Sequence, residues 1–416
     1  MTRPLRVLYL HPFRARGGAT KSLVEVLLAM PRGAICGTAV ASSGLAAEML
    51  VGAGLDVIAV WGIAQWDNTR FGHYRGWRWL ILLRELAYWP ATIRGLRKAA
   101  QKGSYDLIHC NEITAMMVGI LAKWMFHAPL VMHVRSLQRD RNGSRMSAYL
   151  LRILRNRADA VIAIDDAVRR TLPTEQIVDV IHNGLAAPPE LPTRNGDPRF
   201  CVGIVGVLHR SKGLYEFVEA ARILRDRGVV VRLLVVGENV RHLSGISGWL
   251  LRKVDLARDV RGELEDFVAQ HSLQDVVEFS GFVADIRHVY SRIDVICFPS
   301  HLDAPGRPVF EAALFGRPAI VAMRDPTMDV VIPGETGLCI TEPTPNGIAD
   351  AIAAMAQDVE GTREMGRRAR RIALSRFDAR IAAAKTIELY RRVTARSELL
   401  AATQSGAAVA PPVSRR

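Results

Sequence analysis

Short apolar runs alternate along the chain with longer stretches in which apolar residues recur every three or four positions. A run of about four to eight apolar residues is typical of a strand buried on both faces, and the longer spacing is typical of a helix with one apolar side. The predicted strands cover residues 5–10, 35–41, 56–60, 107–109, 130–133, 160–164, 178–181, 200–207, 233–237, 293–298 and 319–322. Because helical stretches such as 19–30 and 214–227 separate them, the pattern predicts an α/β fold with parallel sheets.

A segment rich in Pro, Gly and polar residues, 186–198, divides this pattern into two halves. Such a composition is typical of a linker. We therefore expect an N-terminal domain over residues 1–185 and a second domain over residues 199–377. A last helix is predicted over 378–397, and a disordered tail rich in Ala, Pro, Ser and Arg over 398–416.

The stretch 299–322 reads as a loop, a helix and the next strand. Pro308 suits the first turn of a helix, where its missing N–H costs nothing. Asp303 and Glu311 stand eight positions apart, at the end of the predicted sheet where ligands bind in open α/β folds. A carboxylate accepts hydrogen bonds from two neighbouring sugar hydroxyls, and Gly306 lets backbone N–H groups approach a ligand closely. The alternative is a solvated Asp and a helix-start Glu with no ligand.

Basic residues stand at the start of two predicted helices. Arg210 and Lys212 precede the helix at 214–227, and a second group surrounds the loop after the first strand: Arg14, Arg16, Gly17, Gly18 and Lys21. The positive end of a helix disfavours cations, so these residues indicate an anion that the charges and the free N–H groups bind together. Ordinary tight turns with solvated basic residues are the alternative.

The chain has 55 Lys and Arg residues against 41 Asp and Glu residues, a formal net charge of +14. This charge suits nucleotide phosphates, nucleic acid or an anionic membrane surface, and does not by itself select among them. The five cysteines are scattered without a Cys-x-x-Cys spacing, which favours a reducing compartment and argues against zinc. No stretch has the roughly 18 uncharged apolar residues of a membrane-spanning helix, and the first apolar run is too short for a signal peptide. We expect a cytoplasmic protein.

Aromatic and basic residues are interleaved between residues 61 and 98. The aromatic ones are Trp61, Trp66, Phe71, Tyr74, Trp77, Trp79, Tyr88 and Trp89. The basic ones are Arg70, Arg75, Arg78, Arg84, Arg94, Arg97 and Lys98. This mixture suits a membrane interface or a stacking surface for an acceptor, and a helix buried on all sides is the alternative. No nucleic-acid motif accompanies it, so we expect no nucleic-acid partner.

Three groups of residues in the 299–322 stretch resemble the signature of the family 4 retaining glycosyltransferases, also called glycosyl transferases group 1. They are Pro299-Ser300, Glu311-Ala312 and Gly316-Arg317-Pro318. The resemblance covers most of residues 6–377. It implies the GT-B fold, in which two Rossmann-like domains face each other across a cleft and a C-terminal helix crosses back to the N-terminal domain. Asp303 departs from the family's Glu, and Val207 stands where the family has an Arg before Lys212-Gly213.

The resemblance implies sugar transfer from a nucleotide-diphosphate donor, a UDP- or GDP-sugar, and no metal or other cofactor. Glu311 would hold the ribose, and Asp303 the sugar hydroxyls. Lys212 would stabilise the charge that develops on the leaving diphosphate. His133, at the end of a predicted strand, would lie beside the donor sugar, and a hydrogen-bonded strand-end His is the alternative. The predicted catalytic residues are Asp303, His133 and Lys212. The predicted donor-binding residues are Gly17, Gly18, Arg210, Lys212, Gly306, Arg307 and Glu311.

The function that these features predict is hexosyl transfer to a glycan or lipid-linked acceptor in cell-surface polysaccharide biosynthesis. The acceptor and the basic, aromatic stretch together predict peripheral attachment to an anionic membrane surface, on the inner face of the cell membrane. A Rossmann dehydrogenase is excluded because neither half has Gly-x-Gly-x-x-Gly with an acid about 20 residues on. A non-catalytic GT-B protein that binds nucleotide sugars is the alternative, since Asp303 and Val207 depart from the family pattern.

Overall fold

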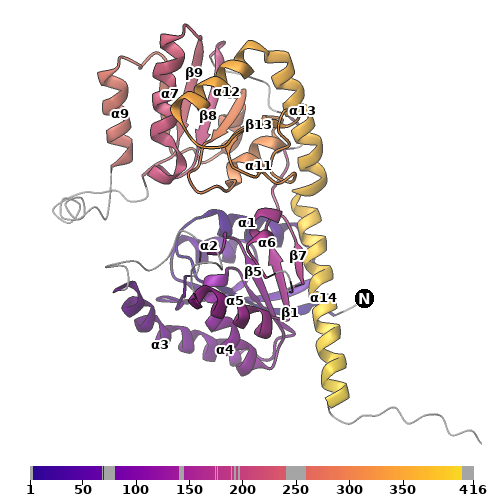
Figure 1. Ribbon diagram of the computed structural model, residues 1–416. Coiled ribbons are helices and arrows are strands. Elements are labelled where there is room, and N and C mark those ends of the chain that lie inside the picture. Colours follow the sequence, from indigo (N-terminus) through magenta and orange to yellow (C-terminus); the bar gives the residue numbers. More distant parts are fainter. Residues whose placement is uncertain are drawn as a thin grey trace, which may run out of the picture. The chain divides into compact units, whose positions relative to one another are not determined.

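The chain forms two compact units, Met1–Ala186 with Ala379–Arg416, and Ala187–Asp378. Figure 1 shows the computed structural model and the labels of its helices and strands. The structure describes residues 3–67, 69, 80–139, 145–173, 175, 177–188, 190–191, 194, 197–239 and 259–404. The predictions for Trp77 and Trp79, and for part of the 186–198 linker, lie outside these residues.

The first unit is built on a seven-stranded parallel sheet of order β3-β2-β1-β4-β5-β6-β7. Its strands are β1 Leu5–His11, β2 Ile35–Ser42, β3 Asp56–Val60, β4 Leu107–Cys110, β5 Leu130–Val134, β6 Ala160–Ala163 and β7 Val178–Val180. The apolar runs of the sequence predicted all seven, because the central strands are buried on both faces.

Helices cover both faces of this sheet. They are α1 Gly18–Ala29, α2 Leu45–Gly52, α3 Leu80–Ala100, α4 Met116–Phe126, α5 Arg145–Arg157, α6 Asp166–Arg170 and α14 Ala379–Gln404, with a 3₁₀ turn η2 Ile113–Ala115. Helices α1 and α14 pack together over β1, where Tyr9, Leu23 and Tyr390 join one apolar core. Helices α3, α4 and α5 connect β3 to β4, β4 to β5 and β5 to β6. Because these crossovers are right-handed and run toward the other edge of the sheet, the three helices lie on the face opposite to α1.

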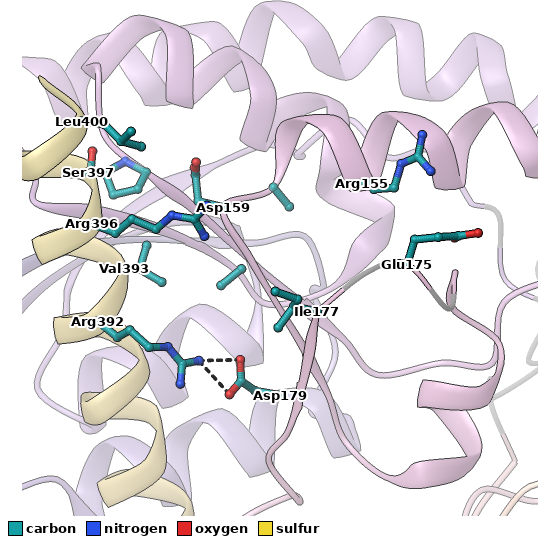
Figure 2. A pocket seen from close by; sticks show the side chains of 13 residues that line it. Arg155, Asp159, Glu175, Ile177, Asp179, Arg392, Val393, Arg396, Ser397 and Leu400 are labelled. Carbon is teal, nitrogen blue, oxygen red and sulfur yellow. Dashed lines mark hydrogen bonds and ion pairs between the residues drawn. The ribbon is translucent and has the colours of Figure 1, made fainter. Parts of the chain in front are cut away.

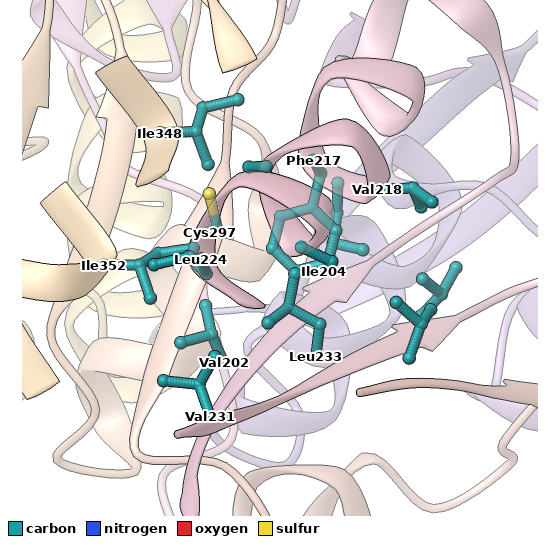
Figure 3. Packing of buried hydrophobic residues seen from close by; sticks show 14 of the residues in the cluster. Val202, Ile204, Phe217, Val218, Leu224, Val231, Leu233, Cys297, Ile348 and Ile352 are labelled. Carbon is teal, nitrogen blue, oxygen red and sulfur yellow. The ribbon is translucent and has the colours of Figure 1, made fainter. Parts of the chain in front are cut away.

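The second unit is a six-stranded parallel sheet of order β10-β9-β8-β11-β12-β13. Its strands are β8 Phe200–Val205, β9 Val231–Val236, β10 Val277–Gly281, β11 Val295–Phe298, β12 Ala319–Ala322 and β13 Gly337–Ile340. Its helices are η4 Arg210–Lys212, α7 Leu214–Asp226, α9 Val260–Gln270, α10 Ile286–Tyr290, α11 Arg307–Leu314, α12 Pro345–Gln357 and α13 Val359–Arg376. Figure 3 shows apolar residues of α7 and α12 packed against β8 and β9, including Phe217, Leu233 and Ile352.

Both sheets have the doubly wound order in which the chain starts near the middle, builds one half and returns to build the other. The prediction of two Rossmann-like α/β domains is confirmed. Several predicted boundaries differ from the structure, and two of them have a clear physical reason. The strand predicted over 200–207 ends at Val205, because Gly206 has a φ of +147° that extended L-residues do not adopt.

The second correction concerns the C-terminal helix. It was predicted to end at residue 397 and runs to Gln404, so the first residues of the predicted tail are helical. The reason is helix propensity, because Glu398, Leu399 and Leu400, with the alanines that follow, all favour helix.

Candidate functional site

The loops that follow β8 and β11 are joined at the point where the strand order of the second sheet reverses. His301 N–H donates to the Ser211 carbonyl at 3.0 Å, and the Ser300 hydroxyl donates to the same carbonyl at 3.2 Å. Ser300 is 2% exposed, so this bond fixes the start of the loop that carries Asp303. In open α/β sheets, the crevice outside this reversal is where ligands bind.

Gly213 permits the close contact between these two loops. It caps η4 with a φ of +72°, and a Cβ at this position would lie 1.9 Å from the Pro299 carbonyl oxygen. A side chain here would push the two loops apart. Gly213 was noted in the sequence only as the partner of Lys212, and the structure gives it a packing role.

We expect Gly213→Ala to lower the melting temperature more than Gly228→Ala does. Gly228 has the same φ of +72° but an open space around its Cβ position, so it controls for backbone strain alone. Overpacking costs roughly 1–3 kcal/mol, and each kcal/mol lowers the melting temperature by about 2–4 °C in a domain of this size. Thermal unfolding of both variants checks this, and equal melting temperatures would contradict the contact.

Lys212 is a half-buried cation without a carboxylate partner in the described part of the chain. Its Nζ lies 5.1 Å from the centre of the Phe298 ring, at the end of β11. Burial lowers the pKa of the Lys212 ammonium from its ordinary value. Since an unpaired buried charge is costly, this arrangement favours an anion beside Lys212. Arg210 is exposed on the same turn, so the structure brings these two predicted donor-binding residues together.

Glu311 lies inside α11 and is 9% exposed. Its Oε1 accepts a 2.6 Å hydrogen bond from Arg307 Nε, one helical turn earlier, and its Oε2 accepts one at 3.2 Å from the Tyr290 hydroxyl. Burial and the Glu311 charge hold the pKa of Tyr290 well above its ordinary range, so the hydroxyl keeps its proton. Arg307 and Glu311 are therefore a pair, and a carboxylate with about four lone-pair positions retains room for a further donor.

Asp303 and Gly306 shape the loop between β11 and α11. Asp303 has a φ of +50°, and its Oδ1 accepts from the Arg324 N–H at 3.0 Å. Gly306 is the N-cap of α11, and a Cβ there would lie 2.2 Å from the Phe298 ring. The sequence predicted that Gly306 lets backbone N–H groups approach a ligand. The structure shows that the packing against Phe298 also requires a glycine here. No side chain caps this helix, so its first N–H groups are not occupied by a cap.

In the first unit, His133 lies near the end of β5 and is 7% exposed. Its Nδ1 is 3.3 Å from an Arg135 terminal nitrogen, so it accepts that bond and the proton sits on Nε2. Burial, Arg135 and His109 hold the pKa of His133 well below its ordinary value. The ring is neutral near pH 7 and suits a hydrogen-bond donor more than a proton-transfer group.

Several buried polar residues around His133 were not predicted. Asn111 Oδ1 accepts from Arg135 at 2.8 Å, and Asn111 Nδ2 lies 3.0 Å from His11 Nδ1. Glu112 is 2% exposed, and burial raises its pKa to about 7. Asn111 and Glu112 directly follow a buried strand, and polar residues at that position were the sequence signal that could have identified them.

The predicted glycine pair opens α1. Gly17 is the N-cap with a φ of −105°, and no atom lies within 4 Å of its Cβ position. Gly18 is the first residue of the helix. No side chain caps this helix either, so its free N–H groups fit the predicted anion-binding role, which stays a prediction.

One cavity of the first unit, about 550 Å³, contains none of the predicted site residues. Figure 2 shows Arg155, Arg396 and Glu175 around it, with Arg392 paired to Asp179 at 2.7 Å. It lies at the amino ends of β6 and β7, away from the carboxyl ends where His133 lies. Among the described residues, no group of three or more His, Cys, Asp or Glu side chains is placed to hold a metal ion.

The sequence pattern of the glycosyl transferases group 1 matches residues 192–372, and that of the glycosyl transferase 4-like domain matches residues 17–184. The chain belongs to the group 1 glycosyltransferases of the GT-B type. A D-inositol 3-phosphate glycosyltransferase of Paenarthrobacter aurescens (strain TC1) is 26% identical over 314 residues, which are 70% of this chain and 73% of that protein. The capsular polysaccharide biosynthesis glycosyltransferase CapM of Staphylococcus aureus is 24% identical over 200 residues, 48% of each chain.

Solved structures share the fold of this glycosyltransferase. Anabaena Alr3699/HepE, in complex with UDP and glucose, has a TM-score of 0.69 at 22% identity and covers 97% of this chain and 100% of its own. Sucrose-phosphate synthase from Thermosynechococcus elongatus has a TM-score of 0.68 at 18% identity, over 94% of this chain and 100% of its own. Together with the family match, the relatives place this enzyme in polysaccharide or glycoconjugate biosynthesis.

Proposed function

We propose that this glycosyltransferase moves a hexose, with retention of configuration and without a metal, from a UDP- or GDP-sugar to a glycan or lipid-linked acceptor in cell-surface polysaccharide biosynthesis. The observation that carries the proposal is Lys212, a half-buried cation with no carboxylate partner in the described residues, at the reversal point of the second sheet. The HepE structures in complex with UDP and with UDP-glucose support a nucleotide sugar as the donor.

We assign the roles of the residues from their surroundings. Lys212 would stabilise the negative charge that develops on the leaving diphosphate, and such stabilisation is usually the largest catalytic term. Glu311, held in position by Arg307 and Tyr290, would accept hydrogen bonds from the ribose diol. Asp303 and the first N–H groups of α11 would bind the sugar hydroxyls. His133 would act as a neutral hydrogen-bond donor.

The test of this function is donor turnover by the full chain. UDP- and GDP-sugars are supplied with glycan and lipid-linked acceptors, and the released nucleotide is measured. Release above the level of a Lys212→Ala variant supports the enzyme. Nucleotide binding without turnover of any donor would favour the non-catalytic alternative.

The face of α3, α4 and α5 supports the proposed attachment to an anionic membrane at the inner face of the cell membrane. Helices α3 and α4 pack against each other. Exposed apolar side chains include Leu83, Leu86 and Trp124, and Trp124 is 74% exposed. The basic residues on these helices are Arg84, Arg94, Arg97, Lys98, Lys123, Arg145, Arg152, Arg155 and Arg157. The acid on these helices, Glu85, is buried and pairs with Arg84, and Lys123 pairs with Asp159 at 2.6 Å, so the other basic residues supply most of the positive charge.

We expect the protein to sediment with anionic vesicles at low salt and to be only partly released at high salt. Each Lys or Arg near an anionic leaflet contributes roughly 1 kcal/mol, which salt screens, whereas aromatic insertion is not screened. Trp124→Ser should increase the release at high salt. Phe282→Ser removes an aromatic side chain that is 64% exposed in the second unit and serves as control. Equal, negligible binding to anionic and neutral vesicles would contradict the attachment.

No helix among the described residues is long and apolar enough to cross a membrane.

A further inference from the structure

A pocket of the second unit with several arginines in its lining lies at the amino ends of the central strands, away from Lys212. Its volume is about 170 Å³. Phe200 begins β8, Asp294 precedes β11 and Arg317 stands shortly before β12, so these three residues border it from the sheet. Arg363 and Arg367 border it from the first turns of α13.

Arg317 differs from the other arginines around this pocket. Its Nε donates to the Tyr290 carbonyl at 2.9 Å, and within the described chain its guanidinium forms no ion pair. The neighbouring arginines are paired: Arg194 with Asp294 at 3.0 Å, Arg363 with Glu360 at 3.5 Å and Arg367 with Glu364 at 2.6 Å. The carboxylates nearest the pocket are thus already engaged.

The surroundings of Arg317 raise the energy of its positive charge. Burial lowers the pKa of Arg317, Asp294 partly offsets this, and Arg194 and Arg363 lower it further. A guanidinium nevertheless keeps its proton in proteins. A bound anion, and not deprotonation, would therefore relieve the repulsion.

The shape of the pocket indicates which anion fits. The planar guanidinium offers paired N–H donors that match the oxygens of a phosphate group. The N-terminal end of α13 borders the same space through Val359 and Thr362, but the Asp358 carboxylate caps it and accepts from the Gly361 N–H at 2.9 Å, so the positive charge at this pocket comes from the arginines. The cavity of about 170 Å³ is large enough for a phosphate group.

We propose that this pocket binds a small phosphate anion, either inorganic phosphate or the phosphate group of a monoester, with Arg317 as its main ligand and Arg363 as a second. The site is separate from the proposed donor site and does not depend on the proposed function. Inorganic phosphate and glucose 6-phosphate serve as probes for the two sources of the phosphate group.

The experiment is calorimetric titration of both probes into the full-length Lys212→Ala variant, in which the donor site is disabled. We expect saturable binding there, weakened at least tenfold when Arg317→Met is added. Arg317→Lys keeps the charge without the planar fork and should weaken binding less, which keeps the test valid if the Met variant does not fold. Arg287→Met, at an exposed ion pair, is the control and should bind as its parent does.

The results separate the pocket from the donor site. Tighter binding of glucose 6-phosphate identifies a monoester, and equal binding identifies free phosphate; either supports the pocket if Arg317 controls it. Loss of all phosphate binding in Lys212→Ala would assign the binding to the donor site and overturn the proposal. Binding that is unchanged by both Arg317 variants would overturn it as well.

Discussion

Replacing Lys212 with Ala is expected to reduce donor turnover on the order of a hundredfold, the usual effect of removing one group that stabilises the transition-state charge. The apo protein should stay folded and at least as stable. Because burial lowers the pKa of Lys212 in the folded state, its charge destabilises the native protein below that pKa, and stability rises with pH as the proton is lost. Removing the side chain removes this penalty.

Steady-state turnover of the nucleotide sugar and the melting temperature of the apo protein measure both effects. Lys385→Ala is the matched control, because Lys385 is exposed on α14 in the first unit. A folded Lys212→Ala enzyme with an unchanged rate would remove Lys212 from the site. A large loss of melting temperature would show that the residue is structural.

Replacing Glu311 and Asp303, one at a time, by their amides should separate nucleotide binding from sugar transfer. Glu311→Gln keeps the size of a side chain that packs against Arg307 and Tyr290 but removes its charge. A hydrogen bond to a charged group is worth roughly 1.5–3 kcal/mol, so we expect nucleotide affinity to fall tenfold or more. Asp303→Asn should leave nucleotide affinity within about twofold. It should slow sugar transfer at least tenfold, because the loss of a hydrogen bond worth about 1.4 kcal/mol in the transition state lowers the rate about tenfold.

Asn is the suitable replacement at Asp303 because the residue has a φ of +50°, which Asn tolerates. Nucleotide affinity is measured by titration of UDP and GDP, and transfer by the rate at saturating donor. If free-nucleotide affinity falls equally in both variants, the assigned division between ribose and sugar is wrong.

The sequence predicted the strands that are buried on both faces, because a continuous apolar run is visible without knowledge of neighbours. It did not predict β10 and β13, which lie at the two edges of the second sheet and are only partly buried. Edge strands need fewer apolar residues, and Glu278 and Ser280 interrupt the pattern of β10.

The candidate site was predictable where residues act locally and not where distant residues meet. Glu311 and Arg307 are four positions apart on one helix, so their pairing was readable from the spacing. Tyr390 contacts His109 at 2.7 Å across 281 positions, and no local pattern signals it. The bond between Arg135 and Asn183 at 2.6 Å joins two strand ends that only the sheet order brings together.

The central claim is that a nucleoside diphosphate binds beside Lys212. The most direct test is a thermal-shift titration of the wild-type protein with UDP and GDP and their sugars, with Lys212→Ala alongside. Stabilisation grows with the logarithm of ligand concentration over Kd, so even a weak ligand raises the melting temperature at millimolar concentration. The account predicts such a rise for at least one nucleotide in the wild type and its loss in Lys212→Ala. No rise with any of these ligands, or an equal rise in both proteins, would contradict it.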